Sequence, residues 1–169
     1  MFIGSEEEKK KGIETEKKFR EWLDNHNIPY MYIQQDIETF SSTFNKLFTG
    51  KRPDFMILVP NFGLIFVDVK YKNITPHFNT FPIDTLDAKK YSKLQRKFNM
   101  HIWYALSNEN VGYKTWYWVP VSKVFEEGRY TEEKSGKSGM PFFAVKIEDF
   151  TQISDEDSLE RLFSKCFSD

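Results

Sequence analysis

Cysteine is almost absent from this sequence: Cys166 is the single one, so no internal disulfide can form. No apolar run approaches the ~20 residues that a helix needs to cross a bilayer. The first residues, MFIGSEEEKKKG, lack the apolar centre of a secretory signal peptide. Together these absences favour a chain that works in a reducing cytoplasm, without a membrane partner.

Several catalytic motifs are missing as well. The three histidines lack metal-ligand spacing with one another and with Cys166, so we expect no zinc site. Gly136-Lys137-Ser138 resembles the end of a phosphate-binding loop, but Thr131 stands where that loop needs its first glycine, and no apolar strand precedes it. We therefore expect no nucleotide cofactor. A serine nucleophile motif is absent too.

Charge is nearly balanced over the whole chain but not along it. The net charge of −1 argues against indiscriminate binding to nucleic acid. Residues 1–45 carry −3 and residues 102–169 carry −4, whereas residues 46–101 carry +6, from ten basic and four acidic side chains. Such a basic segment would attract a phosphodiester substrate, although a solvated basic face has the same composition.

Composition indicates a folded globule, because 40% of the residues are hydrophobic and 17% are aromatic. A chain of 169 residues is long enough to form one domain with a substantial core. We expect most of the seventeen phenylalanines to pack in that core.

The most informative stretch runs from Arg52 to Lys72. Its two apolar runs, Phe55–Val59 and Leu64–Val69, are separated by Pro-Asn-Phe-Gly, which is a strong turn signal. Two short β-rich runs joined in this way predict an antiparallel hairpin.

Charged residues interrupt this hairpin where charge is unexpected. A turn centred near Asn61 sets Asp54 opposite Asp68, and facing carboxylates repel each other. Strand alternation places Lys70 on the same face as Asp68. A divalent cation between the carboxylates would remove the repulsion, and Mg²⁺ is commonly held by one or two carboxylates plus phosphate oxygens. The alternative is that Asp68 and Lys70 form a surface pair and Asp54 caps a turn.

Pro53-Asp54, thirteen intervening residues and Asp68-Val69-Lys70 together resemble the signature of the PD-(D/E)XK nucleases. This family includes archaeal Holliday junction resolvases and many restriction enzymes. The resemblance covers roughly residues 12–107. It implies that Asp54 and Asp68 bind Mg²⁺, with Mn²⁺ as a substitute, and that Lys70 assists the attacking water.

A charged helix is predicted from Ser5 to His26, with Ser5 as its N-cap. Its apolar stripe comprises Ile13, Phe19, Trp22 and Leu23. Glu16 can share the inward face. The stretch Gly12-x-x-x-Glu16 is similar to the first helix of many PD-(D/E)XK enzymes, in which that glutamate joins the metal site. The resemblance thus implies Glu16 as a third metal ligand, whereas a glutamate in a charged helix is usually solvated.

The most basic element is a helix predicted from Asp84 or Thr85 to about Asn99. Its basic side chains are Lys89, Lys90, Lys93, Arg96 and Lys97. We take Lys72, Lys89, Lys90 and Lys93 as candidate DNA contacts, with a solvated helix face as the alternative. The family resemblance implies that this helix supplies a polar or basic side chain next to the site, for which Lys89 or Lys90 is the candidate.

The Gln-x-x-x-Tyr motif of the RecB-like branch is absent from this helix. Asp87, not glutamine, stands four residues before Tyr91. This difference argues against a RecB-like exonuclease.

Patterning also predicts the remaining elements. We expect strands at Tyr30–Ile33, His101–Leu106, Thr115–Val119 and, as an edge strand, Phe142–Ile147. We expect helices at Val121–Glu127 and from Ser154 or Asp155 to Phe167, the latter with Leu159, Leu162, Phe163 and Cys166 inward. Residues 34–51 read as a loop with a helical turn, and residues 73–83 and 128–141 as loops.

The order helix, strand, hairpin, helix, strand, strand predicts a three-layer α/β fold with a mixed central sheet. It agrees with the α/β/α restriction endonuclease-like fold that the resemblance implies, as one domain over residues 1–169 with further strands and a helix in residues 113–169. The implied function is a Mg²⁺-dependent DNA endonuclease, resolvase-like or restriction-like. A homodimer is also expected, because such enzymes often cut both strands.

Two other classes of function stay open. One is a non-catalytic nucleic-acid-binding or scaffold module on the same fold. The other is a cytosolic interaction domain with a phenylalanine-rich surface, which would be favoured if Asp54 and Asp68 lay far apart.

Overall fold

The computed structural model describes residues 6–48, 51–132 and 140–163. Its α-helices are α1 (Glu6–Asn25), α2 (Ser42–Phe48), α3 (Thr85–Phe98) and α4 (Val121–Glu127). Its strands are β1 (Tyr30–Tyr32), β2 (Phe55–Val59), β3 (Gly63–Tyr71), β4 (Thr80–Asp84), β5 (Ile102–Ser107), β6 (Thr115–Pro120), β7 (Arg129–Thr131), β8 (Phe142–Lys146) and β9 (Thr151–Ser154). Short 3₁₀ helices span Ile37–Thr39, Glu109–Val111, Ile147–Asp149 and Leu159–Leu162.

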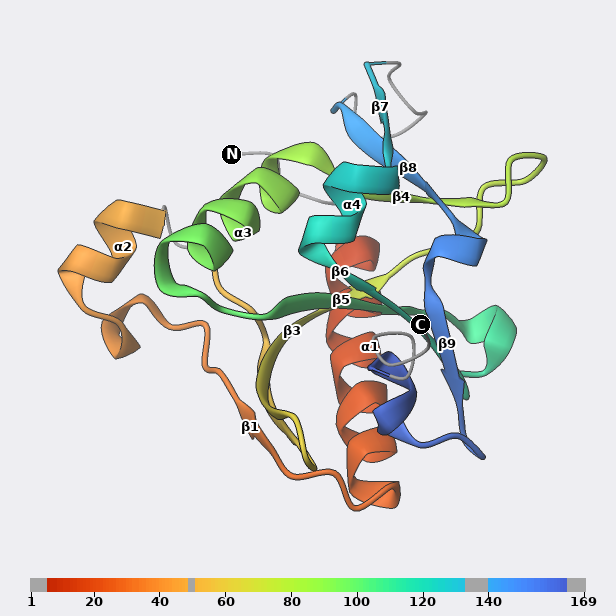
Figure 1. The fold of residues 1–169 in the computed structure, drawn as a ribbon, viewed down its shortest axis with the longest axis horizontal. Helices are drawn as coiled ribbons and strands as arrows, with labels where there is room; N and C mark the ends of the chain where they lie inside the picture. The colour runs from red at the N-terminus through yellow and green to blue at the C-terminus, as the bar shows by residue number, and fades with distance from the viewer. Residues whose placement is uncertain (1–5, 49–50, 133–139, 164–169) are drawn as a thin grey trace.

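A mixed sheet lies at the centre of the molecule (Figure 1), with its six strands in the order β1-β2-β3-β5-β6-β9. Strands β3 and β5 run parallel, joined through α3, and the other neighbouring strands pair antiparallel. The predicted hairpin is confirmed, because β2 pairs with β3 from Phe55 opposite Val67 to Val59 opposite Gly63. At its turn Asn61 and Gly63 have positive φ angles of 61° and 118°, which suits these residue types.

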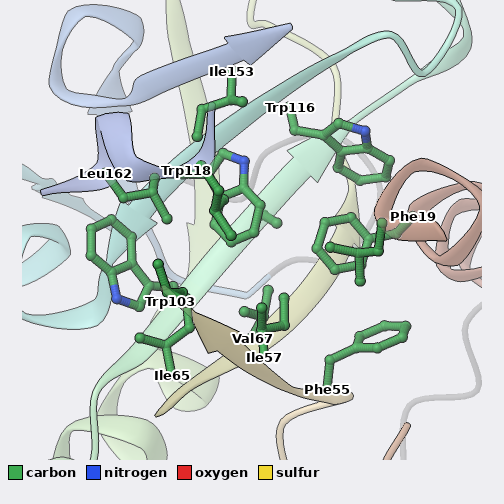
Figure 2. Packing of buried hydrophobic residues seen from close by; sticks show 14 of the residues in the cluster. Phe19, Phe55, Ile57, Ile65, Val67, Trp103, Trp116, Trp118, Ile153 and Leu162 are labelled. Carbon is green, nitrogen blue, oxygen red and sulfur yellow. The ribbon is translucent and has the colours of Figure 1, made fainter. Parts of the chain in front are cut away.

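Helix α1 covers one face of this sheet. Phe19, Trp22 and Leu23 are buried, as their helical spacing predicts. Figure 2 shows Phe19 directed toward Phe55 and Trp116 of the sheet, with ring centroids 5.1 and 4.7 Å away. Fully buried aromatic rings fill the space between α1 and the sheet and form one half of the core.

Two details of α1 differ from expectation or lie outside the described residues. The prediction that Ile13 joins the apolar stripe is wrong, because its side chain is 71% exposed. Thr15 is buried in its place, one turn before Phe19, so the inward stripe passes through 15 and 19 and leaves position 13 on the outer face. The predicted N-cap Ser5 is not among the described residues.

Helices α3 and α4 cover the opposite face (Figure 1), together with a second sheet of three strands in the order β4-β8-β7. The prediction of a loop over residues 73–83 is wrong for β4, in which Phe81 and Ile83 are buried. Pro82 lies between them at a half-buried position, and proline is tolerated there because β4 is an edge strand. Strand β8 was expected at an edge but is central in this small sheet.

The C-terminal part departs most from expectation. The α-helix predicted from Ser154 or Asp155 to Phe167 is wrong up to residue 163: β9, which pairs with β6, ends at Ser154, and a turn and the 3₁₀ helix Leu159–Leu162 follow. The Asp157 carboxylate accepts a hydrogen bond from the Ser154 backbone N–H at 2.9 Å, which closes a turn instead of starting a helix. Leu159, Leu162 and Phe163 are buried as expected, while Cys166 lies outside the described residues.

Other predicted elements are confirmed within a residue or two, including the helices at α3 and α4 and the strands at β5 and β6. The stretch 128–141 contains the short strand β7. Across the described ranges, no helix combines the length and the apolarity that a bilayer span requires.

Candidate active site

The β2–β3 hairpin brings Asp54 and Asp68 onto neighbouring strand positions. Asp54 immediately precedes β2, and its backbone N–H donates to the Val67 carbonyl oxygen at 2.9 Å. The alternate residues Phe55 and Val67 pack on the α1 side, so Asp68 faces α3. Both carboxyl groups are buried, with 8% of Asp54 and 1% of Asp68 exposed. The predicted juxtaposition of the two acids is therefore present in the fold.

Each acid has a partner that fixes it. Asp54 Oδ2 accepts a hydrogen bond from the Val69 backbone N–H at 2.8 Å. Asp68 Oδ1 lies 2.5 Å from the Tyr91 hydroxyl, which α3 supplies. Asp68 Oδ2 is buried and lies 2.9 Å from the Lys70 ammonium, with which it forms an ion pair. The two oxygens of the central acid are thus held by Tyr91 and Lys70.

The pKa values of the two acids are shifted in opposite directions. Burial, and then the neighbouring charge of Asp68, raise the pKa of Asp54 well above its ordinary value. Burial alone would raise the pKa of Asp68 too, but the ammonium groups of Lys51 and Lys70 outweigh it and lower that pKa. Asp68 is thus ionised, and Asp54 resists ionisation until further positive charge arrives.

Lys70 lies next to Asp68 on the same face, as strand alternation predicts. Burial lowers its pKa, but the Asp68, Asp87 and Asp54 carboxylates prevail, so the pKa of Lys70 is raised well above its ordinary value. Its side chain keeps 29% exposure. Lys70 is therefore a charged hydrogen-bond donor at the solvent side of the acids.

Three further residues of the site were not predicted. Lys51 lies 3.5 Å from Asp68 Oδ1 and 3.0 Å from Asp87 Oδ2, and its ammonium is 5.4 Å from the centre of the Tyr91 ring. Asp87 and Tyr91 are one turn apart on α3, so they share its inner face. Their i,i+4 spacing after the Asp-x-Lys strand is the available signal in the sequence, but Asp87 was considered only as a departure from the glutamine of the RecB-like motif.

Glu16 does not join the two aspartates in this structure. Its carboxylate accepts a hydrogen bond from the Tyr32 hydroxyl at 2.8 Å, at the β1 edge of the sheet. In the described part of the chain, no group of three histidine, cysteine, aspartate or glutamate side chains is close enough to hold a metal ion. The three-carboxylate set implied by the resemblance is therefore not assembled among the described residues, although the charge of Glu16 is one of those that raise the pKa of Asp54.

The aspartate pair itself fits a magnesium ion. Asp68 supplies a buried carboxylate whose pKa is lowered, and Asp54 is a carboxyl group whose ionisation a second positive charge would favour. Carboxylate oxygens are the ligands that Mg²⁺ prefers, with waters and phosphate oxygens completing its shell. Two carboxylates are enough for such a site.

The four lysines considered for DNA contact lie outside this charged cluster. Lys89 and Lys93 are exposed on α3, and Lys90 is half-buried. Lys72 is half-buried, and burial together with the nearby charge of Lys70 lowers its pKa. The expectation that Lys89 or Lys90 lies next to the acids is not met, because Asp87 and Tyr91 take the inner face of α3.

A separate cavity has a volume of about 390 Å³, and none of its lining residues belongs to the charged cluster. It is lined by Phe62, Gln95, Arg96, Asn99, Met100, His101, Ile102, Trp103, Pro120 and Ser122. The candidate site is therefore identified by its carboxylate and lysine side chains and not by the volume of a cavity.

No family model matches this sequence. A search of curated protein sequences finds no match either. The fold does have solved counterparts. One is Hjc, a Holliday junction resolvase from the archaeal hyperthermophile Archaeoglobus fulgidus, with a TM-score of 0.51, 14% identity, and coverage of 82% of this chain and 91% of that chain. Another is a nuclease from a fusselovirus, with a TM-score of 0.50, 6% identity and 99% coverage of both chains.

At these identities the similarity concerns the fold. The chain has a three-layer α/β/α fold of the restriction endonuclease-like type, with a mixed central sheet and helices on both faces. The fold class predicted from the sequence is thereby confirmed.

Proposed function

We propose that this protein is a Mg²⁺-dependent DNA endonuclease of the PD-(D/E)XK type, resolvase-like or restriction-like. One observation carries the proposal: Asp54 and Asp68 are buried side by side on a hairpin, with Lys70 2.9 Å from Asp68. The hairpin belongs to a fold shared with a Holliday junction resolvase and a viral nuclease, which supports DNA as the substrate.

Asp54 and Asp68 would hold the ion. When bound, Mg²⁺ supplies Lewis-acid stabilisation of the phosphate and a more acidic bound water, and Mn²⁺ is expected to do the same. The chain's own part is to fix the two carboxylates, through the Val69 N–H for Asp54 and the Tyr91 hydroxyl for Asp68. Rigid positioning of this kind removes the need to reorganise charge during the reaction.

Lys70 has a role that follows from its protonation. An ammonium whose pKa is raised is a poor general base but a good donor to a phosphate oxygen or to the attacking water. We therefore assign Lys70 to charge stabilisation and water orientation.

The substrate would approach from the side of Lys70, which keeps 29% exposure, and the exposed Lys89 and Lys93 of α3 would contact phosphates farther along the DNA. Residues 46–101, which contain the hairpin and α3, have a net charge of +6. Phosphate contacts by such side chains would supply affinity that falls with salt. A homodimer remains part of the proposal, because enzymes of this kind often cut both strands.

The test is incubation of the wild type and of Asp68→Ala with plasmid, branched DNA and RNA, each with Mg²⁺, Mn²⁺ or EDTA. We expect metal-dependent DNA cleavage by the wild type and a loss of at least 100-fold in the variant. Lys123→Met is a matched control, since Lys123 forms an ion pair with Asp149 at 3.8 Å outside the site. Equal cleavage by wild type and Asp68→Ala would refute the assignment.

A second candidate is a non-catalytic DNA-binding or scaffold module on the same fold. It is favoured by the position of Glu16, which pairs with Tyr32 instead of joining the acids. DNA binding by both proteins without cleavage in any metal would select this candidate.

A further inference from the structure

The candidate site contains a closed ring of four charges. Lys51 contacts Asp68 Oδ1 at 3.5 Å and Asp87 Oδ2 at 3.0 Å. Lys70 contacts Asp68 Oδ2 at 2.9 Å and the same Asp87 Oδ2 at 3.6 Å. Each ammonium therefore lies between the same two carboxylates, one from β3 and one from α3.

The four charged side chains of this ring differ in their solvent exposure. The Asp68 side chain is 1% exposed, whereas those of Lys51, Asp87 and Lys70 are 21%, 27% and 29% exposed. The three partly exposed side chains are therefore the ones that a phosphate arriving from solvent can contact, and two of them are ammonium groups.

Charge balance explains why two ammonium groups are present. Without a metal, Asp54, Asp68 and Asp87 carry up to three negative charges against the two positive charges of the lysines. A divalent cation held by Asp54 and Asp68 would leave one positive charge in excess. The single negative charge of a phosphodiester group would balance it. With the cation neutralising Asp68, the charge of Lys51 would interact more strongly with the phosphate than with Asp68.

Asp87 is suited to hold Lys51 at this place. It lies in the first turn of α3, where its backbone N–H donates to the N-cap Asp84 Oδ1 at 2.9 Å. A negative side chain in this turn is favoured by the helix dipole. One turn later, the Tyr91 ring lies 5.4 Å from the Lys51 ammonium, within the range of a cation–π contact.

We propose that Lys51 is a second ammonium of the active site, which binds a non-bridging oxygen of the phosphate to be cut, and that Asp87 is the residue that positions it. This inference rests on the proposed function and adds a substrate contact to it. Lys70 and Lys51 would then flank the phosphate from two elements, β3 and the segment before β2.

The test measures DNA binding without turnover, as fluorescence anisotropy of a labelled duplex with Ca²⁺ in place of Mg²⁺. For Lys51→Met we expect affinity about tenfold weaker and a slope of log affinity against log salt lower by about 1, as for one lost phosphate contact. Lys51→Arg should restore most of both, since it keeps the charge. Lys123→Met should change neither.

A double variant separates this role from a structural one. Lys51→Met leaves Asp68 and Asp87 short of positive charge, so its melting temperature should fall. Adding Asp87→Asn removes one carboxylate, so the melting temperature should recover while DNA affinity stays low. Recovery of both together, or wild-type affinity and salt slope in Lys51→Met, would overturn the inference even if the wild type cleaves DNA. A wild type that neither binds nor cleaves DNA would instead refute the proposed function.

Discussion

The Tyr91 hydroxyl oxygen lies 2.5 Å from Asp68 Oδ1 and 2.8 Å from the carbonyl oxygen of Arg52. A hydroxyl group has one proton, so it donates to one of these oxygens at a time. Through this side chain, α3 is joined to the acid at the centre of the candidate site and to the segment that precedes β2. The relationship links the stability of the fold to the geometry of the site.

Removing this hydroxyl should be costly. Tyr91→Phe keeps the ring, which is fully buried, but leaves a buried carboxylate oxygen without its donor. We expect the free energy of unfolding to fall by about 1–3 kcal/mol, measured by urea denaturation at pH 7.

The neighbouring Tyr104 is the matched control. Its ring centroid lies 5.8 Å from that of Tyr91 and it is 1% exposed, but its hydroxyl has no hydrogen-bond partner among the described residues. Tyr104→Phe should therefore leave stability unchanged or raise it. Equal losses in the two variants would show that the Asp68 contact is not what matters.

The raised pKa of Asp54 makes a prediction about pH. Asp54 keeps its proton in the folded chain at pH values where the unfolded chain, with a pKa near 3.9, has lost it. Its contribution to the free energy of unfolding therefore falls as pH rises from about 4 through the folded pKa. Asp54→Asn removes this loss and keeps an acceptor for the Val69 N–H.

Chemical denaturation in EDTA at pH 4, 6 and 8 would measure this effect. Asp54→Asn should match the wild type at pH 4 and exceed it by about 1–2 kcal/mol at pH 8. Adding Mg²⁺ should reduce the difference, because the cation favours the ionised carboxylate. A difference that does not change with pH would contradict the account of Asp54.

The two faces of α1 predict opposite outcomes for two apolar residues. Phe19 is fully buried against Phe55, Trp116 and Trp118, so Phe19→Ala should lower the free energy of unfolding by about 3–5 kcal/mol. Ile13 is 71% exposed, so Ile13→Ala should change it by less than about 0.5 kcal/mol. Thermal melting of both variants checks which face packs inward.

Sequence patterning predicted the hairpin and the pairing of its acids, because both depend on local rules. The Pro-Asn-Phe-Gly turn defines the register, and side-chain alternation then places Asp68 and Lys70 together. The same alternation was obscured in β4 by Pro82, which made a strand resemble a loop.

Contacts between distant elements were less predictable. The face that α3 turns toward the sheet depends on tertiary packing, and its spacing alone did not show that Asp87 and Tyr91 point to the acids while Lys89 and Lys93 face solvent. Lys51 reaches Asp87 across 36 positions of the chain, a separation at which periodicity gives no information. Glu16 illustrates the reverse case, in which a family pattern implied a ligand that the fold pairs with Tyr32.

The most direct test of the central claim, that Asp54 and Asp68 form a cation site, is calorimetric titration of the DNA-free protein with Mn²⁺. The wild type should bind Mn²⁺, and Asp54→Asn and Asp68→Asn should each weaken binding by about tenfold or more, because each loses a carboxylate ligand. Asp149→Asn, whose carboxylate pairs with Lys123 elsewhere, should bind like the wild type. Equal Mn²⁺ affinity in all four proteins would contradict the account.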